Sequence, residues 1–198
     1  MFQFSIYPPM KILLLILITL VALPVQAEKA VFAGGCFWCV ESAYQDIEGV
    51  SAAVSGFTGG TLQNPTYKGN HSGHYEAVEV TYDPAVISYQ ELLDLFWVNI
   101  DPFDDRGQFC DKGPSYRSAI FVVDASQREL AAASKEVVEA RFPNQGVVTQ
   151  ILPGNRFWPV EEYHQDYYKK NPIRYRYYRF GCGRDARLQE IWGDQASH

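Results

Sequence analysis

An alternation of short strand-like and helix-like segments between residues 29 and 152 limits the fold of this chain more than any other feature. Strands are indicated where apolar residues alternate with polar ones, and helices where apolar residues recur every three or four positions. The expected strands are residues 29–33, 50–57, 77–82, 119–123 and 147–152, and the expected helices are residues 36–46, 88–99 and 126–141. This order predicts an α/β fold, more closely an α+β two-layer sandwich, with helices packed on one mixed sheet around a ferredoxin-like core.

Two of the expected helices carry start signals. Ser88 is followed by Glu91, and Ser126 by Glu129, each at the spacing of a capping box. In that motif the first side chain accepts a hydrogen bond from the backbone N–H of the second residue, and the second side chain returns one. We therefore expect the two helices to begin at these serines.

The pattern fades towards the end of the chain. Residues 158–170 are rich in aromatic side chains and are expected to be partly helical. From about residue 171 we expect an irregular tail, with a short helix near residues 186–192. Within this tail, the basic and aromatic run of residues 174–180 is expected to pack on the surface of the domain.

The first 27 residues have the composition of a secretory signal peptide. Lys11 precedes an unbroken apolar run at residues 12–23, and Val25-Gln26-Ala27 supplies small residues at the spacing that a signal peptidase reads. The run is short for crossing a bilayer; an uncleaved anchor and a buried helix remain the alternatives. The sequence thus predicts export to the periplasm or medium, cleavage near Ala27, and a single domain at residues 28–198.

Length and charge narrow the classes of protein further. A chain of 198 residues with 47% apolar residues suffices for one packed core. The net charge is −6 and no block of basic residues is present, so we expect no nucleic-acid partner. We also expect a monomer.

The sequence holds four cysteines, Cys36, Cys39, Cys110 and Cys182. An exported protein would by default pair four cysteines in two structural disulfides. Cys36, however, follows Gly34-Gly35 at an expected strand-to-helix junction. The glycines allow a sharp turn, and the free N–H groups at a helix start favour a thiolate, which lowers a cysteine pKa by one or more units from about 8.5. This placement favours an activated nucleophile over a buried structural cysteine.

Cys39 lies one helical turn after Cys36, and three kinds of site fit this spacing. A zinc site would need further ligands, for which His71 and His74 are weak candidates. A thiol–disulfide exchanger would use Cys36 and Cys39 alone, and a reductase would attack with Cys36 and resolve with Cys39. His74 is otherwise expected to make loop hydrogen bonds, although pairing with Cys36 in a hydrolase stays open. His164 is assigned no catalytic role.

Five segments, in order along the chain, favour a reductase over the other two kinds of site. Together they resemble the A-type methionine sulfoxide reductases, and the similarity extends from about residue 29 to residue 171. The segments are GCFWC at residues 35–39, GFTGG at 56–60, NPTY at 64–67, GHYEAV at 73–78 and DKGPSYRS at 111–118.

The resemblance implies reduction of the S epimer of methionine sulfoxide, free or in proteins, as a repair reaction, and it implies roles for individual residues. Sulfoxides are poor electrophiles, so an acid must protonate the oxygen as the thiolate attacks the sulfur. Glu76 is the implied acid; it stands where a Gly-rich loop enters an apolar strand, so partial desolvation would raise its pKa. Tyr67 and Tyr116 are implied to donate hydrogen bonds to the sulfoxide oxygen, and Asp111 to help position the reacting groups. Phe37 and Trp38 are implied to form an apolar wall that holds the methyl group of the substrate.

The chain departs from the best-known version of that family at the resolving cysteine. That version has a glycine where this chain has Cys39, and it resolves the Cys36 sulfenic acid with a C-terminal cysteine. Here Cys39, Cys182 and Cys110 could each resolve. Proximity places Cys39 first, the glycines on both sides of Cys182 would let it move in and place it second, and Cys110 is third. A relay is also open, in which a Cys36–Cys39 disulfide forms first and Cys182 then exchanges in.

No bound cofactor is expected, because thiols carry the electrons. The resemblance implies an external thiol reductant such as a thioredoxin-like protein, with oxidised proteins or free methionine sulfoxide as substrates. Two other functions remain open: a periplasmic thiol–disulfide exchanger that uses Cys36 and Cys39, and a binding domain stapled by disulfides.

Overall fold

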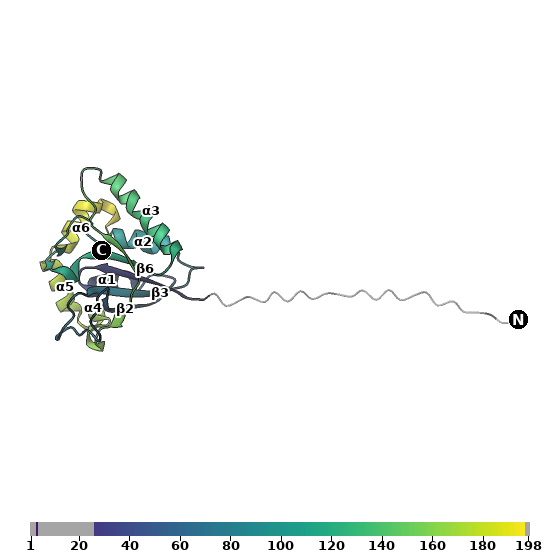
Figure 1. Cartoon of the computed structure of the whole chain (residues 1–198), viewed down its shortest axis with the longest axis horizontal. Coiled ribbons are helices and arrows are strands. Elements are labelled where there is room, and N and C mark those ends of the chain that lie inside the picture. The colour runs from purple at the N-terminus through teal and green to yellow at the C-terminus, as the bar shows by residue number, and fades with distance from the viewer. Residues whose placement is uncertain (1–2, 4–25, 197–198) are drawn as a thin grey trace.

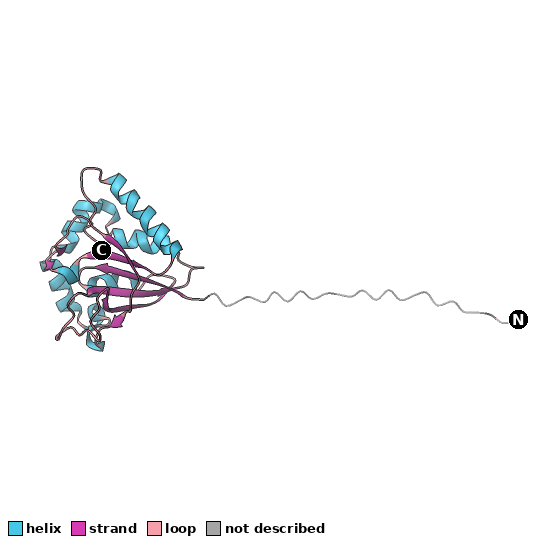
Figure 2. Cartoon of the chain, in the orientation of Figure 1, coloured by secondary structure: helices cyan, strands magenta, loops and turns pink. Residues whose placement is uncertain are grey.

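The computed structural model describes residues 3 and 26–196, so the apolar run of the predicted signal peptide lies outside the described residues. The described chain folds around a six-stranded sheet with helices gathered against it (Figures 1 and 2). The strands of this sheet are β1 (Glu28–Gly34), β2 (Val50–Thr58), β3 (Tyr75–Tyr82), β6 (Ser118–Val122), β7 (Gln150–Pro153) and β8 (Trp158–Pro159). A separate two-stranded ribbon consists of β4 (Gly107–Gln108) and β5 (Asp111–Lys112).

The strand order confirms the ferredoxin-like core. The sheet runs β7-β6-β1-β3-β2-β8, and every neighbouring pair within its middle four strands is antiparallel. At one edge β7 pairs parallel with β6, and at the other β8 pairs antiparallel with β2. The sheet is therefore mixed, as the sequence predicts.

The helices follow the expected order with one corrected start. They are α1 (Phe37–Tyr44), α2 (Tyr89–Trp97), α3 (Ala125–Arg141), α4 (Tyr167–Lys170), α5 (Pro172–Gly181) and α6 (Arg184–Trp192), with 3-10 turns η1 (Pro114–Tyr116), η2 (Glu162–His164) and η3 (Gly193–Gln195). The capping box of Ser88 and Glu91 on α2 is confirmed. The predicted cap Ser126 is wrong, because Asp124 stands first after β6 and its carboxylate accepts from the Gln127 N–H at 2.8 Å.

Both faces of the central strand β1 are buried, which its alternating side chains explain. Phe32 points to the main core between the sheet and helices α1, α2 and α3, where it stacks on Tyr44 and Phe96. The opposite face carries a smaller apolar cluster, Val31, Ala33, Ala77, Ala119 and Phe121. The two layers of the predicted sandwich are thus sheet and helices.

The expectation of an irregular tail from about residue 171 is wrong, since α5 and α6 occupy most of it; the short helix expected near residues 186–192 lies inside α6. The two helices bury only four residues, Tyr175, Arg184, Leu188 and Trp192, so their sequences carry a weak apolar pattern. Arg184 is buried and donates to the Asn99 carbonyl at 2.6 Å, and the Trp192 indole donates to the Ile100 carbonyl at 2.9 Å. These bonds tie α6 to the segment that follows α2.

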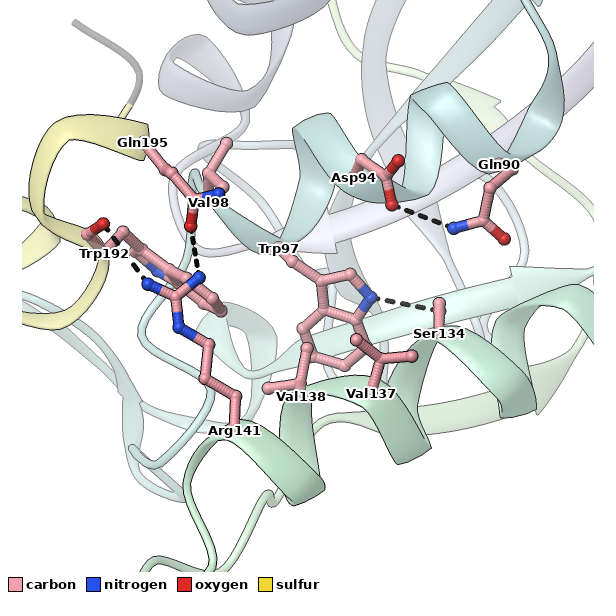
Figure 3. A pocket seen from close by; sticks show the side chains of 10 residues that line it. All are labelled: Gln90, Asp94, Trp97, Val98, Ser134, Val137, Val138, Arg141, Trp192 and Gln195. Atoms are coloured by element: carbon pink, nitrogen blue, oxygen red, sulfur yellow. Dashed lines mark hydrogen bonds between the residues drawn. The ribbon is translucent and has the colours of Figure 1, made fainter.

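A hollow of about 340 Å³ lies between α2, α3 and the end of the chain (Figure 3). The Arg141 guanidinium lies over the Trp192 ring, 5.2 Å from its centroid, and the Trp97 indole donates to the Ser134 hydroxyl at 3.0 Å. Its lining residues include no cysteine, so the thiols belong elsewhere. Among the described residues, no helix has the length and apolar character that spanning a bilayer requires.

Candidate active site

Cys36 lies where the sequence predicts, immediately before α1 at the end of β1. Its carbonyl accepts the backbone N–H of Cys39 at 3.1 Å, so it begins the helix. Gly35 has a φ of +85°, and a side chain there would come within 2.6 Å of Gln108 Cβ. Only glycine fits this turn, and the buried Gln108 amide, bonded to the Asp101 backbone, closes the space behind it.

Cys36 and Cys39 carry free thiols and share a side-chain hydrogen bond, with 6% and 1% of their surfaces exposed. Burial raises the pKa of Cys36, contrary to the lowered value that its helix start predicts. The pKa of Cys39 falls to about 6, chiefly because the Cys36 thiol donates a hydrogen bond to it; burial raises this pKa, and the charges of Arg184 and Arg179 lower it further. In this closed state Cys39 is thus the first of the two thiols to ionise.

Glu76 on β3 is the acid nearest the thiols, and it is 1% exposed. Its Oε2 accepts the Phe37 backbone N–H at 3.1 Å, while its Oε1 is buried and has no hydrogen-bond partner among the described residues. Burial raises the pKa of Glu76 to about 8, aided by the charge of Asp111 and opposed by the Phe37 bond and by Tyr116. The carboxyl is therefore largely protonated at neutral pH, as its place in the sequence predicts.

Three further predicted residues lie near Glu76 and come from separate segments: Tyr67, Tyr116 and Asp111. Burial, followed by the charges of Glu76 and Cys36, raises the pKa of Tyr67 to about 12. Burial and the Glu76 charge also raise the pKa of Tyr116, which ends η1. Burial raises the pKa of Asp111 on the β5 ribbon. The fold therefore brings all of these predicted residues together, with both phenols held as neutral donors.

The predicted apolar wall is made mainly by Trp38. Its ring stacks on Tyr167 with centroids 3.8 Å apart, and its indole N–H donates to His164 Nδ1 at 3.1 Å. The Phe37 side chain is 0% exposed and packs in the core under Tyr67, with ring centroids 6.0 Å apart. Phe37 therefore backs the wall, and its backbone N–H serves the site.

Helix α5 covers the thiols of Cys36 and Cys39. This contact with the site is not predicted from the sequence. The run at residues 174–180 was expected to be surface packing, yet its inner face meets the site. Tyr178 donates to Asp111 Oδ2, shares a hydrogen bond with Cys36, and sets its ring edge-on to Trp38 with centroids 5.8 Å apart. Tyrosines three apart in this run were the only sequence signal of an inward face.

Cys110 and Cys182 form a disulfide with a Cα–Cα distance of 4.8 Å. It joins the residue before Asp111 to the end of α5, and Cys110 is exposed. From the sequence, each of the two is a candidate partner of Cys36, and their pairing with each other is not predicted. One bonded pair and one free pair also differ from the two-disulfide arrangement of a stapled domain.

The two loop histidines form hydrogen bonds with backbone groups. His74 accepts the Gly60 N–H through Nδ1 at 3.3 Å, and its Nε2 meets the Leu62 carbonyl at 2.9 Å. His71 Nδ1 meets the Thr66 carbonyl at 3.2 Å. The loop-bonding role predicted for His74 is thus confirmed, and neither the hydrolase pairing nor the zinc reading gains support from these contacts.

The chain is similar to several known proteins. The family model for peptide methionine sulfoxide reductase matches residues 28–196. Peptide methionine sulfoxide reductase MsrA 2 of Caulobacter vibrioides is 54% identical over 171 residues, which are 85% of this chain and 87% of the relative. Mxr1 of Saccharomyces cerevisiae in reduced form is 31% identical, with a TM-score of 0.70 over 76% of this chain and 88% of that one. Methionine sulfoxide reductase A of Corynebacterium diphtheriae is also 31% identical, with a TM-score of 0.67 over 78% and 79% of the two chains.

Proposed function

This chain belongs to the peptide methionine sulfoxide reductase family, and we propose that Cys36 is the thiol with which it reduces methionine S-sulfoxide. The enzyme is a thiol-dependent oxidoreductase of the methionine repair class. The observation that carries the residue assignment is the Glu76 carboxyl beside Cys36: it is buried and its pKa is raised to about 8, so it holds a proton at neutral pH. The sulfoxide oxygen of the substrate would accept this proton.

In the proposed first step the Cys36 sulfur attacks the sulfoxide sulfur while Glu76 donates a proton to the oxygen. The sulfur–oxygen bond of the substrate breaks, and the oxygen passes to Cys36. Methionine leaves with a two-electron-reduced sulfur, and Cys36 becomes a sulfenic acid. A protonated carboxyl in a dry site is well suited to this step, because proton donation offsets the charge that develops on oxygen.

Orientation of the substrate is assigned to the groups around that carboxyl. The phenols of Tyr67 and Tyr116 have raised pKa values and stay protonated, so both can donate to the oxygen. The Trp38 ring offers an apolar surface for the methyl group. Exchange of the methyl group and the oxygen would place each against the wrong surface, and this accounts for preference for one epimer.

Cys39 is the proposed resolving thiol. Cys39 adjoins Cys36, and the charges of Arg184 and Arg179 favour its thiolate, which attacks the sulfenic sulfur and releases the oxygen as water. With Cys110 and Cys182 reduced, Cys182 then attacks Cys39, and Cys110 attacks Cys182. The product has free Cys36 and Cys39 and a Cys110–Cys182 disulfide, which is the arrangement in the structure.

The exposed Cys110 is the point at which an external dithiol would enter. We propose a thioredoxin-like protein in this role; yeast Mxr1 has been solved in complex with Trx2. No bound cofactor is needed, because each step moves two electrons between sulfur atoms.

Export remains a proposal. The apolar run at residues 12–23 followed by small residues at 25–27 supports cleavage after Ala27, with residues 28–198 as the catalytic domain.

Assay of the two resolved epimers with Glu76→Gln tests the proposed function. The substitution should cut reduction of the S epimer at least about a hundredfold, the size of a lost general acid. Thiol–disulfide exchange by Cys36 and Cys39, measured as reduction of insulin disulfides, needs no such acid and would be unaffected by Glu76→Gln. Full S-epimer activity in Glu76→Gln, or equal use of both epimers by the unaltered enzyme, would contradict the assignment.

A further inference from the structure

Tyr178 connects two groups of the site that do not otherwise meet. Its hydroxyl donates to Asp111 Oδ2, and a side-chain hydrogen bond between Tyr178 and Cys36 lowers the pKa of the Cys36 thiol. Because the one phenol proton goes to Asp111, the phenol oxygen can only accept from the Cys36 S–H while that thiol is protonated. The residue lies on α5, outside all five sequence segments that carry the family resemblance. A phenol between a thiol and a carboxylate forms a continuous chain of hydrogen bonds from sulfur to oxygen.

The position of Tyr178 is fixed from both sides of α5. The Tyr175 hydroxyl lies 2.6 Å from the Ser42 hydroxyl on α1, and Arg179 pairs with Asp185 at 2.6 Å. The Tyr178 ring itself meets Trp38 edge-on. The Tyr175 and Tyr178 contacts seat α5 on α1, the Arg179–Asp185 pair ties it to α6, and the disulfide at Cys182 holds its end, so the Tyr178 hydroxyl is held in place by packing.

The carboxyl at the far end of the chain is suited to take a proton. Burial raises the pKa of Asp111, while the Tyr178 bond and the charges of Arg184 and Lys112 lower it. Asp111 is therefore a better base than a solvated carboxylate and remains able to ionise. Glu76 faces Cys36 from β3, but as the proposed acid it must keep its own proton.

We propose that Tyr178 relays the proton of the Cys36 thiol to Asp111, an inference that rests on the proposed role of Cys36 as nucleophile. The Cys36 S–H bond breaks and its proton moves to the phenol oxygen, while the phenol proton moves to Asp111 Oδ2. The phenol ends unchanged, the sulfur becomes a thiolate, and Asp111 becomes neutral. No electrons are transferred, and the proton held at Asp111 balances the one that the oxygen takes up in the first step.

Cys39 is the competing acceptor, because it shares a hydrogen bond with Cys36. The test therefore uses Cys39→Ser as the parent protein, kept without reductant so that Cys110–Cys182 stays bonded and Cys36 is the one free thiol. The rate of alkylation at Cys36 by iodoacetamide is followed against pH, with the adduct located by mass spectrometry. Tyr178→Phe keeps the ring on Trp38 and removes only the hydroxyl.

The relay predicts that Tyr178→Phe moves the alkylation midpoint up by about one pH unit, since a hydrogen bond to the charged form is lost. Asp111→Asn should give a similar shift, and the double variant should be no worse than either single one, because both break the same chain. Tyr177→Phe is the matched control, 81% exposed on the outer face of α5, and should leave the midpoint unchanged.

An unchanged midpoint in Tyr178→Phe would overturn the relay, as would additive shifts in the double variant. Thermal melting of each variant separates these results from loss of folding. The alkylation midpoint needs no catalysis, so it stays informative if Cys36 is not the nucleophile. That separate failure would show as continued methionine release by Cys36→Ser.

Discussion

Burial of Glu76 should make the protein less stable as pH rises, and one substitution should remove this dependence. An unfolded glutamate has a pKa of about 4.3, whereas burial raises the pKa of Glu76 in the folded protein to about 8. Between these values the unfolded chain releases its proton and the folded chain keeps it. Stability is therefore full below about pH 4 and is lost progressively as pH rises to about 8.

The size of the effect follows from proton linkage. With those two pKa values, the loss of stability is about 1 kcal/mol at pH 5 and about 3–4 kcal/mol at pH 7, a difference of about 2–3 kcal/mol. Glu76→Gln has nearly the same shape and cannot titrate. The gap in unfolding free energy between the variant and the unaltered protein should therefore change by about 2–3 kcal/mol over this range, in favour of the variant at pH 7.

Urea denaturation at pH 5 and pH 7, without reductant, measures this gap. Glu79→Gln is the matched control, three residues along β3, where the side chain pairs with Lys29 at 2.6 Å near the surface. The difference in unfolding free energy between Glu79→Gln and the unaltered protein should change by no more than about 0.5 kcal/mol between pH 5 and pH 7. A gap for Glu76→Gln that is equally flat would refute the reasoning that this carboxyl is held protonated by burial.

Three further outcomes can be checked together. Gly35→Ala should lower the unfolding free energy by about 2 kcal/mol or more in urea melts, because φ is +85° and the new methyl would meet Gln108; an unchanged midpoint would argue against the turn geometry. Cys182→Ser should still form the Cys36–Cys39 disulfide in one turnover but recycle slowly with a protein dithiol; accumulation of sulfenic acid in this variant would instead make Cys182 the direct resolver. Expression with the native N-terminus should give an exported product starting at Glu28, as read by N-terminal sequencing, and a full-length cytosolic product would oppose the signal-peptide prediction.

Much of the fold could be predicted from local pattern, because β3 alternates apolar and polar side chains, β1 is a short apolar run, and α2 carries its own capping box. The start of α3 was misplaced since two polar residues two positions apart both fit a cap, and only the end of β6 decides that Asp124 is used. After residue 171 only part of α6 was predicted, and α5 was missed. Few residues of these helices are buried, and among them Tyr175, Arg184 and Trp192 have polar groups whose hydrogen-bond partners are distant in the sequence.

The same distinction applies to the site. Cys36 and Glu76 stand out locally, one after two glycines and one at a loop-to-strand boundary. The electrostatics of Cys36 were not local, because its burial and its bond to Tyr178 come from α5, more than a hundred residues away. The pairing of Cys110 with Cys182 likewise depends on where α5 ends against the β5 ribbon.

The central step of the proposed reaction is the transfer of the sulfoxide oxygen to Cys36, and a single turnover of Cys39→Ser tests this step directly. In that variant, with Cys110–Cys182 bonded and no reductant present, Cys36 is the one free thiol. Addition of the S epimer should release one methionine per protein, and dimedone should trap a sulfenic acid located at Cys36 by mass spectrometry. Methionine release without a trapped adduct at Cys36, or equal release by Cys36→Ser, would contradict the account.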